Sequence, residues 1–221
     1  MIILSDLHMG AGDAADDFSG EDCQADIDLL DDIEMWKEAG EKIVLAGDIL
    51  DLWQAEYWKV LQAHGAAVQA LFSAAEAYVV GNHDSDALGK KLYGLEGLPS
   101  LVVDGLWIEH GHAHDPVVGR FPLLARAGCW LGGLAERVIH RDVDVLAERV
   151  ARWFSRTGRH GGNARYLMTM ADAAVRHDCT RAVFGHSHQF MQFSKVPIGD
   201  MQIANSGTWT GGRRDFVQIQ T

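Results

Sequence analysis

The chain has little cysteine, and it lacks long apolar runs. Cys23, Cys129 and Cys179 stand far apart among 221 residues and form no CxxC pair, so the sequence predicts no disulfide framework and indicates a reducing compartment. No run of about 18 apolar residues exists, so no transmembrane helix is expected. The first polar motif begins at Asp6, which leaves no room for a signal peptide before the fold. These absences predict a cytoplasmic protein.

Basic residues are scarce as well, and they are unevenly spread. The 19 Lys and Arg face 31 Asp and Glu, a net charge of −12 that disfavours long duplex nucleic acid as a partner. Residues 1–119 carry −18, whereas residues 120–165 carry +5, with nine Arg and no Lys. Because Arg grips phosphate with a planar fork of donors, Arg120 and Arg126 are candidate substrate contacts. A solvated helical face of ion pairs is the alternative.

Hydrophobic patterning predicts an α/β layered fold in one domain, residues 1–221. Strands alternate with helices at first, and a hairpin is expected to turn at Asp104–Gly105. Helices are expected at 23–38 and 55–73, and strands at 1–5, 42–47, 77–81, 100–111 (the hairpin), 181–186, 189–196, 201–205 and 215–220.

Residues about 116–178 are expected to form a helical cap insertion. Three amphipathic patterns lie within it, around 123–138, 145–154 and 166–173. We expect their apolar stripes to pack on the body or on one another. A cap that is both apolar and cationic also suits an amphiphilic anion, such as a nucleotide joined to a lipid, and would allow peripheral contact with a membrane.

Five short polar motifs each follow an apolar strand. They are DLH at 6–8, GDILD at 47–51, GNHD at 81–84, HGH at 110–112 and GHSH at 185–188. Loops beyond the carboxyl ends of strands in an open α/β sheet converge on one crevice, so these motifs are expected to meet. They offer oxygen and imidazole nitrogen but no thiolate, a set that suits Mn, Fe or Zn better than Mg or Ca.

In this order the five motifs resemble those of the calcineurin-like metallophosphoesterases. The resemblance implies two packed β-sheets flanked by helices (a four-layer sandwich) and two divalent metal ions, Mn first, with Zn or Fe as alternatives. One ion would be held by Asp6, His8, Asp48 and His188, and the other by Asp48, Asn82, His110 and His186, with Asp48 bridging.

The same resemblance implies hydrolysis of a phosphodiester or phosphomonoester. A hydroxide shared by the two metals would attack phosphorus in line. His83 would protonate the leaving oxygen as general acid, and Asp84 would orient the His83 imidazole through a hydrogen bond. Asn82 is expected to contact the substrate as well, and Asp51 to steady the metal loop.

A closer resemblance is to the UDP-2,3-diacylglucosamine pyrophosphohydrolase subgroup. It rests on GDILDLW at 47–53, the helical insertion, and the ending NSGTWTGGRRDFVQI at 205–219. That subgroup typically has Arg where this chain has His83. A general acid helps an alkoxide leave and does little for a stable phosphate, so His83 favours a simple ester, whereas the cap favours a nucleotide-lipid pyrophosphate.

Two further classes stay open, a nuclease acting on short single strands and a metal-free binding scaffold. The complete ligand set argues against the scaffold. Other His and Trp residues have plainer interpretations: His64 as a core histidine, His140, His160 and His177 as surface residues, Trp53, Trp130 and Trp153 as core, and His112 and His114 as bystanders of His110.

Overall fold

The computed structural model describes residues 1–18, 24–115, 118–139 and 161–220. Its first sheet has the strand order β11-β1-β2-β3-β5-β4. Its four central strands are parallel, and the first three of them alternate with helices as the sequence predicts. The strands are β1 (Ile2–Leu4), β2 (Ile43–Ala46), β3 (Ala75–Val79), β4 (Lys91–Leu92), β5 (Leu95–Leu98) and β11 (Val217–Gln218).

The second sheet has the strand order β6-β7-β8-β10-β9, and its three central strands are also parallel. The strands are β6 (Leu101–Val103), β7 (Leu106–Ile108), β8 (Arg181–Phe184), β9 (Met191–Lys195) and β10 (Gln202–Asn205). The predicted hairpin is confirmed: β6 and β7 pair antiparallel, and φ is +48° at Asp104 and +71° at Gly105. Positive φ at both central residues matches the right-handed twist of the strands.

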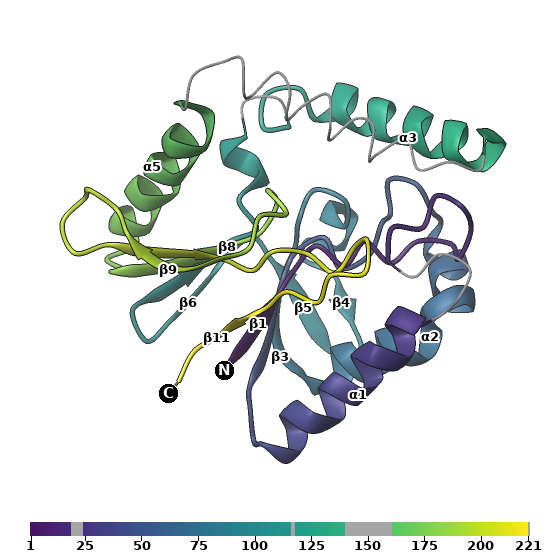
Figure 1. The fold of residues 1–221 in the computed structure, drawn as a ribbon, viewed down its shortest axis with the longest axis horizontal. Helices are drawn as coiled ribbons and strands as arrows, with labels where there is room; N and C mark the ends of the chain where they lie inside the picture. The colour runs from purple at the N-terminus through teal and green to yellow at the C-terminus, as the bar shows by residue number, and fades with distance from the viewer. Residues whose placement is uncertain (19–23, 116–117, 140–160, 221) are drawn as a thin grey trace.

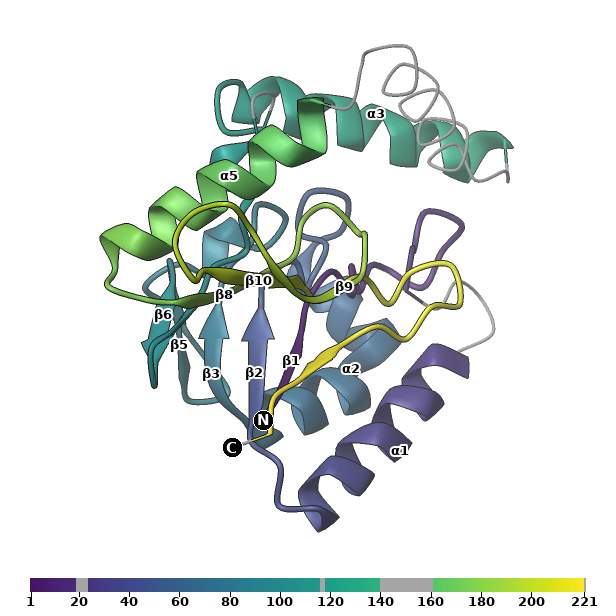
Figure 2. The same cartoon turned by 60° about the vertical axis from the view of Figure 1, so that its left-hand side comes forward.

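Helices cover the outer faces of the two sheets, which gives four layers (Figures 1 and 2). α1 (Gln24–Glu38) and α2 (Tyr57–Ala74) cover the first sheet, and α5 (Gly161–Arg176) covers the second. α3 (Pro122–Ile139) instead lies across the ends of the strands. The predicted fold class, two packed sheets flanked by helices, is therefore confirmed.

Side chains of successive strand residues point into different layers. In β1, Ile2 and Leu4 join the core under α1 and α2, while Ile3 joins the core between the sheets. Because both faces of such strands are buried, they read as unbroken apolar runs without polar alternation. A third core of Trp107, Phe184, Ile203 and the α5 residues Met170 and Ala174 lies behind the second sheet.

The region expected to form the cap has two different placements. α5 packs on β8 and β10 as part of the helical layer, while α3 spans the strand ends. The expected helix around 145–154 lies outside the described residues, as do His140, Trp153 and His160. Among the described residues, no helix is long and apolar enough to cross a membrane.

The apolar stripe of α3 faces away from the body. The alternative expectation, that the stripes pack on one another, involves the helix expected around 145–154, which lies outside the described residues. Leu123 is 81% exposed and Val138 is 73% exposed, and Trp130, expected in the core, is 51% exposed. The residues facing the body are small or polar, Cys129 and Arg137 among them. Periodicity shows that a stripe exists but not which surface it meets.

His64 is a core histidine, as predicted, and it has a structural role. The side chain is buried in α2, where its Nε2 lies 2.8 Å from the Asp16 carboxylate and its Nδ1 lies 2.9 Å from that of Asp26. It therefore joins three segments: α2, α1 and the loop after β1. The two carboxylates outweigh the effect of burial and raise its pKa to about 9.

Candidate metal centre

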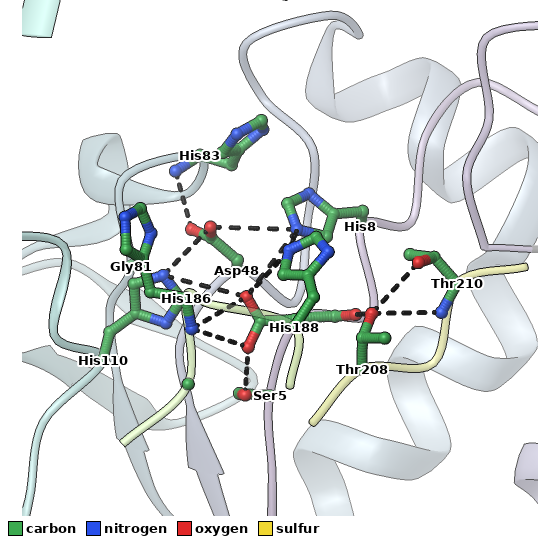
Figure 3. A network of polar contacts seen from close by, with 12 residues as sticks. Ser5, His8, Asp48, Gly81, His83, His110, His186, His188, Thr208 and Thr210 are labelled. Carbon is green, nitrogen blue, oxygen red and sulfur yellow. Dashed lines mark hydrogen bonds and ion pairs between the residues drawn. The ribbon is translucent and has the colours of Figure 1, made fainter. Parts of the chain in front are cut away.

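The five predicted motifs meet at one edge of the two sheets. Each follows the carboxyl end of a parallel strand: β1, β2 and β3 in the first sheet, β7 and β8 in the second. Because the sheets pack face to face, segments 180 residues apart come into contact: the backbone N–H of His186 donates to the Asp6 carboxylate at 3.0 Å. Figure 3 shows the histidines of these loops gathered around Asp48.

The side chains form two adjacent groups with the composition of cation sites. One group is Asp6, His8 and His188, and the other is Asp48, His110 and His186; within each group the ligating atoms lie within 4.8 Å of one another. His8 Nε2 lies 3.9 Å from oxygens of both Asp6 and Asp48, which links the groups. Each group is part of one of the two ligand sets that the resemblance implies.

Close contacts within the groups join donor atoms that suit a cation. His188 Nε2 lies 3.2 Å from both Asp6 Oδ1 and His8 Nε2, and His110 Nε2 lies 3.0 Å from Asp48 Oδ2. His110 Nδ1 donates to the Ala46 carbonyl at 3.0 Å, which leaves Nε2 as the nitrogen facing the group. Lone pairs from several strands thus point at the same small volume.

A buried amide oxygen supplies the test of whether these residues fit a cation. Asn82 Oδ1 is buried without a hydrogen-bond partner among the described residues. An unpartnered buried oxygen costs about 1–3 kcal/mol, and a divalent cation would satisfy it. The predicted ligands therefore fit a divalent cation. Asn82 lies beside the Asp48 group, because the backbone N–H of its neighbour His83 donates to Asp48 at 2.7 Å.

Backbone strain is concentrated at the same positions. Among the described residues, eight that are not glycine have positive φ, and five of these are candidate ligands: Asp6, His8, Asp48, His186 and His188. Such a conformation costs about 1–3 kcal/mol per residue and persists where the surroundings impose it. The surrounding sheets thus hold these side chains in directions that relaxed loops would not give.

Two glycines make room for the carboxylates. A Cβ on Gly81 would lie 2.1 Å from Asp48 Oδ1, and a Cβ on Gly185 would lie 2.3 Å from Asp6 Oδ2. Real Cβ contacts are never this short, so any other residue would displace the carboxylate or the loop. Glycine at these two positions therefore permits the close approach of backbone to carboxylate.

The electrostatics of the groups are those of paired opposite charges. Burial would raise the pKa of the Asp48 carboxyl, but His110 and His83 outweigh it and hold that pKa well below its usual range. Conversely, burial would lower the pKa of His110, but Asp48 and Asp6 raise it to about 9. Protons on the imidazoles balance the carboxylates, so a bound cation would release protons as it enters.

His83 lies at the rim of the centre, on a platform formed by Trp53 and Asp51. Its ring stacks on Trp53 with centroids 4.3 Å apart and an interplanar angle of 22°. Its Nδ1 lies 2.9 Å from Asp51 Oδ1, and that carboxylate also accepts the backbone N–H of Trp53 and Gln54. Asp51 therefore fixes the imidazole as well as its own loop. The indole of Trp53, expected as core, is buried but serves as the stacking surface.

Asp84 does not contact the His83 ring, which corrects the predicted orienting role. Its carboxylate accepts the N–H of Gly81 at 2.5 Å and of Ile49 at 2.8 Å, and so ties the third motif to the second. Adjacent residues on a turning backbone project in different directions, and the fully buried Asp84 points into the protein. The partner of His83 comes from 32 residues upstream, which no local spacing could indicate.

A sixth strand end supports the centre, and sequence reasoning missed it. After β10, Asn205 donates to the Gly185 carbonyl at 2.8 Å, and the Thr208 hydroxyl donates to the Asp6 carbonyl at 2.8 Å. Ser5 and Ser206 share a 2.6 Å hydrogen bond, and the Ser5 hydroxyl contacts the Asp6 carboxylate. The stretch NSGT resembles the other polar strand ends, which was a usable signal.

The other histidines near the fourth motif stay outside both groups. His112 is held neutral, because burial and the neighbouring His110 lower its pKa to about 4. His114 Nε2 lies 3.2 Å from Glu109. His177, expected at the surface, is exposed and stacks on Trp107.

The predicted arginine contacts differ in their distance from the centre. Arg126 reaches from α3 to the Leu52 carbonyl at 3.5 Å and to Asp86 at 3.7 Å, both beside the second and third motifs. Arg120 is exposed and lies over the Phe121 ring. A third arginine, Arg137, donates to Asp13 at 2.7 Å and to the Gln54 carbonyl at 3.2 Å.

A cavity of about 400 Å³ lies where α3 meets the body. Trp53, on which the His83 ring stacks, is one of its lining residues, whereas His83 itself is not. Its lining residues are Ala11, Asp13, Leu52, Trp53, Gln54, Ala55, Glu56, Lys59, Trp130 and Arg137.

Comparison with known proteins gives little beyond this geometry. No family model matches the chain, and no curated protein matches it. Among solved structures, that of a single mutant of Vps29 from Entamoeba histolytica is similar, with a TM-score of 0.42 and 13% sequence identity. The match covers 96% of this chain and 76% of that chain.

Proposed function

We propose that this protein is a metal-dependent phosphoric ester hydrolase that cleaves a phosphodiester or phosphomonoester. The observation behind the proposal is the pair of adjacent Asp/His groups at the shared edge of the two sheets. Asp6, His8, Asp48 and His188 would hold one divalent ion, and Asp48, Asn82, His110 and His186 the other. Bound there, two such ions polarise a phosphoryl oxygen and provide a nucleophile from water. Mn is the ion we expect first.

In this proposal, the protein's own residues position the ligands and the proton donor. Strained backbone and buried partners hold the ligand side chains in place, so little reorganisation is needed when the substrate binds. The N–H of His83 holds Asp48, while its ring stands at the rim, 14% exposed, and is oriented by Asp51. We propose that this imidazole gives its proton to the leaving oxygen. The Asn82 amide is the nearest candidate for an additional substrate contact.

A larger substrate, such as a nucleotide-lipid pyrophosphate, is the second candidate. It is favoured by the cavity beside His83, which has two indoles, Trp53 and Trp130, and two cations, Lys59 and Arg137, in its lining. A planar or apolar group joined to the reacting phosphate would fit such a lining. A nuclease acting on short single strands is a weaker candidate, because residues 1–119 carry −18.

The test is hydrolysis by protein reconstituted with Mn²⁺. Bis-p-nitrophenyl phosphate, p-nitrophenyl phosphate and a UDP-sugar lipid would be compared, with Asp48→Ala as the inactive variant. We expect metal-dependent cleavage of at least one simple ester. A pyrophosphate that is cleaved far faster than either ester would make the second candidate the function. No turnover of any of the three, by protein that contains metal, would favour a binding scaffold.

A further inference from the structure

Besides the two main groups, His83 belongs to two further groups of ligating side chains: one with His8 and Asp48 of the main centre, and one with Asp51 and Cys129. Ligating atoms of Asp51, His83 and Cys129 all lie within 4.8 Å of one another. They come from three places in the chain: the second motif, the third motif and the middle of α3. The cluster is therefore the point where α3 meets the proposed general acid.

The chemistry of this cluster differs from that of the main centre. The two main groups contain only carboxylate and imidazole ligands, whereas this one adds a sulfur. A set of one thiolate, one imidazole and one carboxylate suits Zn²⁺ and softer cations, and it discriminates against Mn²⁺ and Mg²⁺. Three protein ligands leave a fourth tetrahedral position for water.

The ligands are already arranged to close on a cation. Asp51 is fixed by the N–H groups of Trp53 and Gln54, and His83 is fixed by stacking on Trp53. α3, which presents Cys129, is tied to the body through Arg137 and Asp13 at 2.7 Å. A Zn²⁺ ion with bonds of about 2.0–2.3 Å holds its ligands roughly 3.3–3.8 Å apart, so small side-chain rotations suffice.

We propose that Asp51, His83 and Cys129 form an inhibitory site for Zn²⁺ or a similar thiophilic cation, separate from the catalytic metals. A cation there ligates the imidazole and the carboxylate that orients it, so His83 no longer serves as proton donor. The same ion links α3 to the two loops and closes the side of the centre that borders the cavity. The inhibitory effect rests on the proposed function, whereas cation binding does not.

The experiment uses Cd²⁺ as the probe, because a Cd²⁺–thiolate bond has an ultraviolet charge-transfer absorption that oxygen and nitrogen ligands lack. Full-length protein saturated with Mn²⁺ is titrated with Cd²⁺. We expect about one equivalent of thiolate absorption in the wild type, its loss in Cys129→Ser, and its retention in Cys179→Ala and Cys23→Ser. Absorption that persists in Cys129→Ser, or that is missing in the wild type, would overturn the proposal.

A pair of carboxylate variants tests the geometry. Asp51→Asn should weaken Cd²⁺ binding at least tenfold, whereas Asp86→Asn, at an exposed carboxylate near α3, should leave it unchanged. Equal affinities in the two variants would show that Asp51 is no ligand and would overturn the site as drawn.

The functional consequence is measured separately. With an alkyl phosphodiester as substrate, Cys129→Ser should keep the basal rate but need at least tenfold more Zn²⁺ for half-inhibition. Unchanged Zn²⁺ sensitivity would overturn the inhibitory role. If no ester is cleaved by any form of the protein, the proposed function fails, and the Cd²⁺ titration still decides whether the site exists.

Discussion

The strand-end loops and α3 border the same site but are built in opposite ways. The loops bury Asp6 and Asp48 almost completely and hold them by several hydrogen bonds, with strained backbone. α3 leaves its apolar face exposed, and Arg126 and Arg137 attach it to the body. Exposed ion pairs contribute little, about 0–1 kcal/mol each. In the proposed function, the chemistry belongs to the rigid region and the choice of substrate to the loosely attached one.

The largest expected effect comes from the centre of the rigid region. Asp48→Ala should reduce bound Mn²⁺ from about two ions per chain to near zero, because Asp48 is the proposed bridge. Loss of the several kcal/mol that such ions supply would lower hydrolysis about a thousandfold or more. Metal analysis and single-turnover assays would check this. Asp51→Asn, equally buried but in neither main group, should keep both ions; equal metal loss in the two variants would contradict the assigned ligands.

Substitution of His83 tests the place where the strand-end loops meet α3. His83→Ala should keep full metal content but lose about a hundredfold on an alkyl phosphodiester, and much less on a p-nitrophenyl ester, whose leaving group needs no proton. Asp51→Asn should show the same dependence on leaving group with a smaller loss, about tenfold, because it only orients the ring. Equal losses on both esters would make His83 a phosphate-binding cation and favour the pyrophosphate substrate.

A moderate effect is expected from the cap. The double variant Arg120→Ala/Arg126→Ala should raise KM for a nucleotide-lipid about tenfold and change kcat little, while p-nitrophenyl esters should not be affected. Steady-state kinetics with both substrate types would check this. Equal damage to both would mean that these residues stabilise the packing of α3 and do not contact the substrate.

The smallest expected effect is on the stability of the fold at His64, which lies outside the candidate metal centre. Because the pKa of His64 is raised to about 9, the charged imidazole stabilises the fold fully below about pH 6.5, and this contribution disappears as the pH rises through about 9. His64→Gln should remove roughly 2 kcal/mol at pH 6 and almost none at pH 10. Urea unfolding of metal-loaded protein at both values would test this; a loss that does not depend on pH would contradict it.

The α/β alternation and the polar motifs at the strand ends could be predicted from the sequence because both are local patterns. Each apolar strand is followed directly by its polar motif, so motifs such as Asp6–His8 and His186–His188 can be recognised in the sequence. The hairpin of β4 and β5 was missed, because two-to-four-residue strands interrupted by glycine give no periodic signal.

Contacts between distant segments could not be predicted from spacing. The partner of His83 is Asp51 and not its neighbour Asp84, and Cys129 comes near both only because α3 crosses the strand ends. Nor could the orientation of the α3 stripe be predicted, since a helical period fixes a face without fixing what that face meets.

The pairing of β1 with β11 has a consequence for biosynthesis. Ile2 lies opposite Gln218, and Thr208 holds the carbonyl of Asp6, so the first ligands synthesised depend on some of the last residues. At translation rates of roughly 5–20 residues per second, Asp6 waits roughly 10–40 s for His188 to be added. The proposed metal centre can therefore be completed only after residue 188 has been synthesised.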